Sequence, residues 1–246
     1  MKIWAIADLH LAVSCPDKDM AVFGPAWSGY MEKMAERWRE RIGKEDLVLI
    51  PGDISWAMRP DEARADLEWI EALPGKKVII RGNHDYWWTS IKKVREVLPP
   101  SIVALHHSAV RIGDVAIAGT RLWDSEEYRF DSLVQQVENP RERVDKPVVE
   151  DEKIFARELG RLEIALKAID RKAPLKIVMV HYPPIGPDLA PSKVSRMLEG
   201  AGIDLCLFGH LHNLKTKGPL FGEARGVRYL LTSADYLDFT PLQVAG

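Results

Sequence analysis

The sequence predicts an α/β fold, and three observations support this prediction. Short apolar runs of strand length recur along the chain. Segments with apolar residues at helical spacing lie between several of these runs. The strand-like runs are almost continuous in Val, Ile and Leu rather than alternating with polar residues, which is typical of a sheet covered on both faces.

Seven apolar runs are predicted to be strands, because each is short and bounded by polar or turn residues. They are residues 2–7, 47–50, 78–80, 115–118, 175–180, 205–208 and 227–231. The stretch 102–120 reads as consecutive short strands, which predicts that part of the sheet is antiparallel or mixed.

Four segments are predicted to be helices: 28–41, 61–73, 154–169 and 191–198. In the third, Phe155, Leu159, Leu162 and Leu166 follow one another at i, i+4, i+7 and i+11, the spacing of one helix face. The chain has no internal repeat and no dividing linker, so we expect one domain over 1–246. Residues 121–152 are charged and interrupted by two prolines, which favours either a lid over a site or a solvated loop.

Composition narrows the function classes. The net charge is −2, and the composition indicates no broad cationic surface, which disfavours nucleic acid as a partner. Cys15 and Cys206 are expected to be a loop thiol and a buried thiol rather than a disulfide. We expect no leader at the start of the sequence, and no apolar run is long enough for a membrane span. We therefore expect a cytoplasmic protein without membrane contact or an obligatory protein partner.

Metal-ligating residue types stand where five of the predicted strands end. They occur in Asp8-Leu9-His10, Gly52-Asp53, Gly82-Asn83-His84-Asp85, His181 and Gly209-His210-Leu211-His212. Residues i and i+2 of an extended chain face the same side, which predicts that each D-x-H or H-x-H pair points into one site. The glycines allow a sharp turn and a close approach. One such block is weak evidence, but five together predict a centre for borderline divalent metals: Mn, Fe, Zn or Co.

The ordered series D-x-H, GD, GNHD, H and GHxH resembles the calcineurin-like metallophosphoesterase superfamily, over residues 8 to 212. The resemblance implies a four-layer sandwich in which two mixed β-sheets are flanked by helices. It also implies two metal ions, with manganese favoured. The first would be bound by Asp8, His10, Asp53 and His212, and the second by Asp53, Asn83, His181 and His210, with Asp53 bridging.

The resemblance further implies a phosphoesterase in which a metal-bridging hydroxide attacks phosphorus. His84 would protonate the leaving group, and Asp85 would orient His84. The second block, Gly52-Asp53-Ile54-Ser55-Trp56-Ala57-Met58, lacks the GDxVDRG of Ser/Thr protein phosphatases, so a bacterial small phosphohydrolase or phosphodiesterase is expected. A nuclease is the alternative, and a non-catalytic scaffold is disfavoured by the complete ligand set.

A further set of residues could contact the substrate and determine its identity. Asn83 is expected to contact the substrate, and Trp56 and Trp87 either form a platform for it or pack in the core. Arg81 and Arg121 either contact phosphate or lie on the surface, which is the default for arginine. His106 and His107 stand outside the motifs and are expected to be packed or solvated.

Overall fold

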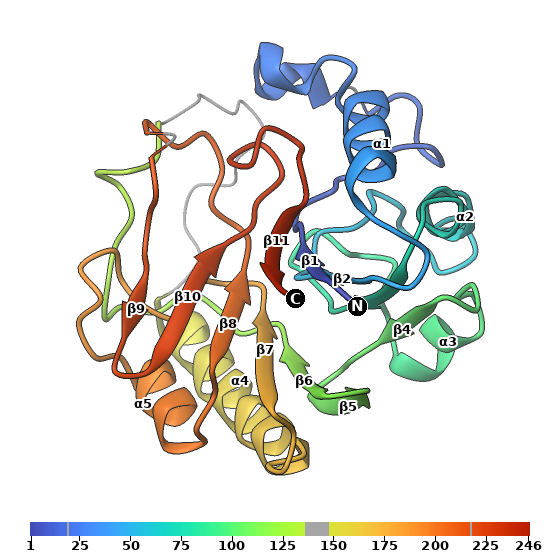
Figure 1. The fold of residues 1–246 in the computed structure, drawn as a ribbon. Coiled ribbons are helices and arrows are strands. Elements are labelled where there is room, and N and C mark those ends of the chain that lie inside the picture. Colours follow the sequence, from blue (N-terminus) through green and yellow to red (C-terminus); the bar gives the residue numbers. More distant parts are fainter. Residues whose placement is uncertain (19, 136–147, 217) are drawn as a thin grey trace.

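The computed structural model describes residues 1–18, 20–135, 148–216 and 218–246. It contains two mixed β-sheets, drawn in Figure 1. The first has the order β11-β1-β2-β3-β4, with bounds Leu242–Ala245, Ile3–Ala5, Leu47–Ile50, Lys76–Ile79 and Ile102–Ala104. The second has the order β5-β6-β7-β8-β10-β9, with bounds Ser108–Ile112, Val115–Thr120, Leu175–Val180, Leu205–Phe208, Val227–Leu231 and Glu223–Ala224.

The sheets pack face to face because alternate residues of each strand enter different cores. In β1, Ile3 and Ala5 lie in the core between the sheets, whereas Trp4 lies in the core on the outer face. In β8, Leu205 faces the inner core and Cys206 the outer one. The predicted four-layer α/β sandwich is therefore confirmed.

Helices cover the two outer faces (Figure 1). The core outside the first sheet includes residues of α1 (Tyr30–Arg41), α2 (Arg64–Glu71) and α3 (Ile91–Arg95), and the core outside the second includes residues of α4 (Val148–Ala168) and α5 (Lys193–Gly200). The 3₁₀ turns η1 (Met20–Phe23) and η2 (Pro25–Trp27) precede α1. The sequence patterns did not predict α3 or β11.

The two sheets meet at one edge, beyond the carboxyl ends of their parallel strands. Strands β1, β2 and β3 run parallel, as do β6, β7, β8 and β10. The chain after β1 then bonds to the chain after β10: Ala7 N donates to Thr232 O at 2.7 Å, and Ala234 N donates to Ala7 O at 3.0 Å. This junction brings loops from both sheets to one place.

The segment 121–152 is partly packed on the fold where it is described. Leu122 is fully buried, and Tyr128 Oη donates to Pro183 O at 2.6 Å, whereas Glu126 and Arg129 are exposed. Helix α4 begins at Val148, six residues before the predicted start, because charged residues such as Glu152 and Lys153 are good helix formers that carry no apolar periodicity. Residues 136–147 of the predicted lid lie outside the described residues. No helix in the described ranges is long and apolar enough to cross a membrane.

Candidate metal centre

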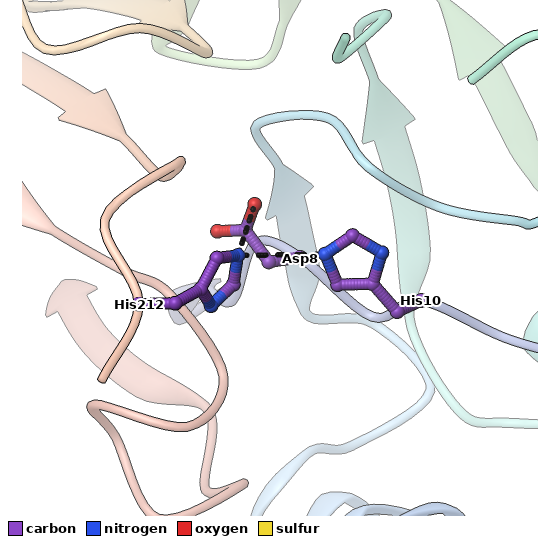
Figure 2. A group of neighbouring side chains, drawn as sticks. All are labelled: Asp8, His10 and His212. Atoms are coloured by element: carbon purple, nitrogen blue, oxygen red, sulfur yellow. Dashed lines mark hydrogen bonds and ion pairs between the residues drawn. The ribbon is translucent and has the colours of Figure 1, made fainter. Parts of the chain in front are cut away.

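Three side chains from opposite ends of the chain converge at the edge where the sheets meet (Figure 2). Asp8 and His10 lie on the loop after β1, and His212 lies on the loop after β8. His212 Nε2 is 3.5 Å from Asp8 Oδ1 and 3.4 Å from His10 Nε2. The ligand atoms of this group all lie within 4.8 Å of one another, which is close enough to surround one metal ion.

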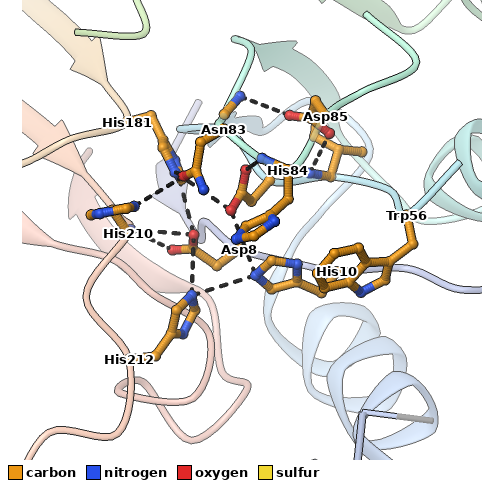
Figure 3. A network of polar contacts seen from close by, with 12 residues as sticks. Asp8, His10, Trp56, Asn83, His84, Asp85, His181, His210 and His212 are labelled. Carbon is orange, nitrogen blue, oxygen red and sulfur yellow. Dashed lines mark hydrogen bonds and ion pairs between the residues drawn. The ribbon is translucent and has the colours of Figure 1, made fainter. Parts of the chain in front are cut away.

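A second group of the same kind shares Asp8 and adds Asp53 and His181. His181 Nε2 is 3.5 Å from Asp53 Oδ2 and 2.6 Å from Asn83 Oδ1. His210 Nδ1 lies 3.0 Å from the same Asn83 oxygen. Figure 3 shows Asp8, Asn83, His181 and His210 pointing toward one another. With the contacts of Asp53 to His10 and His181, the fold brings all seven predicted ligands into one place.

The Asp53 carboxylate belongs to the second group and also lies near the first. Its Oδ1 accepts a hydrogen bond from the main-chain N–H of His84 at 2.8 Å. Its Oδ2 is 3.7 Å from His10 Nε2 in the first group and 3.5 Å from His181 Nε2 in the second. One oxygen is thus held by the backbone, and the other faces both groups.

The loops that carry these residues adopt unusual backbone conformations. Asp8, His10, Asp53 and His210 have φ values of 59°, 45°, 53° and 74°. Non-glycine residues seldom adopt this left-handed region, and such residues concentrate at functional sites. Asp8 and His10 lie on the same side, as predicted, but not because the chain is extended there. Strand β1 ends at Ala5, and the left-handed loop conformation brings the two side chains together.

Glycine is required at two close approaches between loops. A Cβ atom on Gly82 would lie 2.0 Å from Asp53 Oδ1, and one on Gly209 would lie 2.3 Å from Asp8 Oδ2. Any side chain at either position would therefore displace a carboxylate of the site. This agrees with the expectation that the motif glycines serve close packing.

The ionisable side chains of the centre are buried and close together, so burial and neighbouring charges both shift their pKa values. Burial raises the pKa of Asp53 well above its usual value, and the negative charges of Asp85 and Asp8 add to the effect. Burial lowers the pKa of His212, but the charges of Asp235 and Asp8 outweigh it and hold that pKa well above its usual value. A positive ion placed here would relieve the cost of ionising Asp53.

The donor atoms fit divalent metal ions. His181 Nδ1 is 2.9 Å from the carbonyl oxygen of Pro51, and His212 Nδ1 is 2.9 Å from Asp235 Oδ1. In the neutral ring, an Nδ1 that donates to its oxygen leaves a lone pair on Nε2 facing the centre, which is the usual arrangement of metal-binding histidines. A metal ion would take the place of the second proton on His212. Burial lowers the pKa of His10 and His210 well below the usual value, so both rings are neutral and able to act as ligands.

His84 lies beside this centre without belonging to either group. Its ring is half-buried, 4.9 Å from the ring of Trp56 and 5.6 Å from that of His10. Its Nδ1 has no hydrogen-bond partner in the described ranges. Burial lowers its pKa, although the charge of Asp53 acts in the opposite direction.

Asp85 does not orient His84 through a hydrogen bond to this unpartnered Nδ1. Its fully buried carboxylate accepts hydrogen bonds from Ile54 N at 2.8 Å, Gly82 N at 2.8 Å and Trp87 Nε1 at 2.9 Å. It therefore ties the loop after β2 to the loop after β3, because both loops donate to it. The predicted role of Asp85 is corrected to this bracing of the two loops.

The two tryptophans of the predicted platform have different environments. Trp56 is half-buried, and its ring stacks on His10 with 5.0 Å between centroids. Trp87 is fully buried in the core outside the first sheet, so it presents no surface to a substrate. Of the two alternatives expected for Trp87, substrate platform or core packing, its burial supports core packing.

Asp235 is a site residue for which the sequence offered no physical argument. Its carboxylate is 2.9 Å from His212 Nδ1 and accepts a hydrogen bond from Asn213 N at 2.9 Å. It follows β10 and stands in no ligand-like motif. Only the junction of the two sheets brings it to His212.

The sequence of this chain is similar to those of several known proteins. A family model described as calcineurin-like phosphoesterase matches residues 1–214. Gene 66 protein of Mycobacterium phage D29 is 41% identical over 88 residues, which cover 34% of this chain and 40% of that protein. Gene 66 protein of Mycobacterium phage L5 is 44% identical over 52 residues, or 21% of this chain and 25% of that protein. The chain thus spans less than half the length of these relatives.

One solved structure supports the fold. Phosphopantetheinyl hydrolase (PptH) from Mycobacterium tuberculosis superposes with a TM-score of 0.56 at 16% sequence identity. The alignment covers 94% of this chain and 88% of that protein. At this identity the likeness extends to the arrangement of helices and strands alone.

Proposed function

The chain belongs to the calcineurin-like phosphoesterase family, and on this basis we propose that it is a metal-dependent hydrolase of small phosphate monoesters or diesters, nucleotides included. The observation that supports a dinuclear centre is the position of Asp53 Oδ2, 3.7 Å from His10 Nε2 and 3.5 Å from His181 Nε2. A carboxylate oxygen in this position is suited to lie between two cations.

Each ion would be held by four side chains, and Asp53 would be common to both. Asp8, His10 and His212 complete the first set, and Asn83, His181 and His210 complete the second. When bound, the two ions would neutralise the phosphate oxygens and acidify a water that serves as nucleophile. The bracing of the loops by Asp85 and the fit at Gly82 hold the donor atoms in place before any ion or substrate arrives.

His84 is proposed as the acid that protonates the leaving-group oxygen. It lies outside the donor groups, its ring is partly exposed, and Trp56 packs against it, so its orientation is restricted. The negative charge of a bound phosphate ester would favour the protonated imidazole against the effect of burial. After transfer, the ring regains its proton from water. Asn83, with its amide oxygen at the centre, is proposed to contact the phosphate as well.

Small esters are favoured over nucleic acid as substrates. The net charge of −2 supplies no extended basic surface for a polynucleotide backbone. A nuclease using the same centre remains the alternative, and binding to DNA that weakens steeply with salt would favour it. Manganese as the native ion and a cytoplasmic location remain predictions from the sequence.

The test is hydrolysis of p-nitrophenyl phosphate and of bis-p-nitrophenyl phosphate by the full chain. After chelation of metals the protein should be inactive, and Mn²⁺ should restore turnover with two ions bound per chain. Asp53→Asn provides a control for activity that does not depend on the centre. Failure to hydrolyse either ester with Mn²⁺, Zn²⁺, Fe²⁺ or Co²⁺ bound would overturn the proposal.

A further inference from the structure

Two buried aromatic side chains stand against the histidines of the metal centre. Trp27, at the end of η2, and Tyr182, directly after His181, are each 3% exposed. Trp27 belongs to the core outside the first sheet, and Tyr182 belongs to the core outside the second. Neither residue stands in a ligand motif, and the proposed mechanism gives neither a role. Each sheet thus contributes one aromatic ring to the surroundings of the centre.

Trp27 contacts both histidines of the first donor group. The centroid of its ring is 5.9 Å from that of His10 and 5.8 Å from that of His212, with interplanar angles of 68° and 60°. Aromatic rings at these distances and steep angles attract one another and restrict one another's orientation. In the described ranges the Trp27 ring contacts neither histidine of the second set. One indole therefore supports the two imidazoles of the first ion position alone.

Tyr182 has the same relationship to the second set. The centroid of its ring is 5.4 Å from that of His181 and 4.1 Å from that of His210. The ring of Trp123 packs on Tyr182 at 5.1 Å. Among the residues that the structure describes, the Tyr182 ring contacts neither histidine of the first group. The two ion positions therefore have separate aromatic supports, one from each core.

Helix α1 and the C-terminal part of the chain keep Trp27 in place. The rings of Tyr30 and Phe239 pack on it at 5.2 Å and 5.1 Å. Tyr30 Oη also donates to His10 O at 2.5 Å, so the same helix holds the main chain of this ligand. Because a close-packed core resists displacement of one of its members, the indole is a rigid support.

The spacing of the donor atoms is what these supports preserve. His10 Nε2 and His212 Nε2 are 3.4 Å apart. Two nitrogens bound at about 2.0–2.1 Å to one ion with tetrahedral geometry lie about 3.4 Å apart. Without support, an imidazole on a loop rotates about its side-chain bonds, and restricting it would lower the affinity for an ion. A ring that already holds both imidazoles removes this cost from metal binding.

We propose that Trp27 and Tyr182 are positioning residues that each set the affinity of one metal ion, Trp27 that of the first and Tyr182 that of the second. The rings act through the imidazoles and touch neither the substrate nor the ions. The two ions are then held with separately adjustable affinities, although the Asp53 carboxylate lies near both groups. The inference rests on the proposed dinuclear centre, but it does not depend on the hydrolysis of any ester.

The test is calorimetric titration of the full chain with Mn²⁺. Trp27→Leu should weaken the first ion about tenfold and leave the second unchanged, and Tyr182→Leu should do the reverse. An Asn83→Ala background tells the ions apart, because this change is expected to leave the first ion as the tighter one. In that background Trp27→Leu should lower the affinity for the tighter ion, and Tyr182→Leu should not.

Three further variants separate positioning from general stability. Trp38, on α1, is fully buried in the same core as Trp27 and contacts no histidine ring in the described ranges, so Trp38→Leu should lower the melting temperature without changing either affinity. Tyr182→Phe keeps the ring and should retain the affinity for the second ion. Trp27→Phe keeps a smaller ring and should lose only about threefold at the first ion, so the test does not depend on the folding of Trp27→Leu.

The outcomes separate this inference from the proposed function. Equal weakening of both ions by Trp27→Leu and by Tyr182→Leu, or unchanged affinities in both folded variants, would overturn the inference and leave the dinuclear centre intact. If each variant weakens its own ion but neither p-nitrophenyl ester is hydrolysed, the proposed function fails and the positioning roles stand. Binding of fewer than two ions by the unaltered chain would overturn the dinuclear centre and this inference with it.

Discussion

Asp235 and His212 form a hydrogen-bonded pair at the metal centre, with 2.9 Å between Asp235 Oδ1 and His212 Nδ1. The pair turns the ring so that His212 Nε2 faces Asp8 and His10. Because the other Asp235 oxygen accepts a hydrogen bond from Asn213 N, the carboxylate is held on both sides. A residue from the C-terminal part of the chain thus controls the orientation of a ligand in the last sequence motif.

Replacing this carboxylate should weaken one metal position. Asp235→Asn should lower the affinity for the first ion about 10- to 100-fold, because an amide holds the ligand ring and its tautomer less well. Calorimetric metal titration measures the change. Asp238→Asn, three residues away, removes contacts to Lys33 and Arg37 instead and should leave metal affinity unchanged. Equal affinities in the two variants would contradict the role of Asp235.

Changes to Asp53 and Asn83 should differ in the number of ions affected. Asp53→Asn should weaken both ions, since Oδ2 faces both donor groups. Asn83→Ala should weaken only the second, because its amide oxygen contacts His181 and His210. The number of ions per chain, measured by elemental analysis after dialysis, separates the two results. Loss of a single ion from Asp53→Asn would argue against bridging.

His84 should affect turnover without affecting metal content. His84→Ala should keep two ions and lose about 10²- to 10⁴-fold in kcat. The loss should be smaller for p-nitrophenyl esters than for alkyl esters, because a good leaving group needs less protonation. Steady-state kinetics with a series of leaving groups would show it. An equal loss across the series would mean that His84 is not the acid.

Gly82 and Gly160 offer a matched pair of glycine substitutions. Gly82→Ala would place a Cβ atom against Asp53, so we expect loss of metal binding and a destabilisation of more than about 2 kcal/mol. Gly160 lies within α4, and a Cβ atom added there would meet nothing within 4 Å, so Gly160→Ala should stabilise by up to about 1 kcal/mol. Chemical denaturation of both variants gives the comparison, and similar effects at the two positions would contradict it.

The stability of the fold should fall in mild acid because of His106. Burial, the charge of His107 and the neighbouring arginines lower the pKa of His106 from 6.5 to about 4. Below pH 6.5 the unfolded chain therefore binds a proton at His106, whereas the folded chain does not until the pH approaches 4. The stability that neutral His106 contributes to the folded state is complete above pH 6.5 and is lost as the pH falls toward 4. His106→Gln should reduce the acid-induced loss in unfolding free energy by roughly 1–3 kcal/mol. Urea denaturation at pH 7 and pH 5 measures it, and identical pH dependence with and without His106 would refute it.

Much of the framework was predictable because buried segments show strong local patterns. The strands 47–50, 175–180 and 205–208 coincide with β2, β7 and β8, since both faces of these strands are covered and their sequences are apolar apart from Lys176. Strand β11 and helix α3 were missed for the opposite reason. Each is short, and β11 is stabilised by pairing with β1 at the other end of the chain, which leaves no local pattern.

Local sequence was enough to establish the order of most strands and helices and the residue types available for metal binding, because apolar periodicity and motif spacing are local properties. Which of these residues meet depends on the folded chain. Left-handed loop conformations turn Asp8 and His10 toward one point, and the junction of the sheets places Asp235 behind His212. Packing also buries Trp87 and brings Arg121 to Glu158 of α4. These contacts join residues far apart in the chain, and their geometry depends on the packing of two sheets, which no short stretch of sequence encodes.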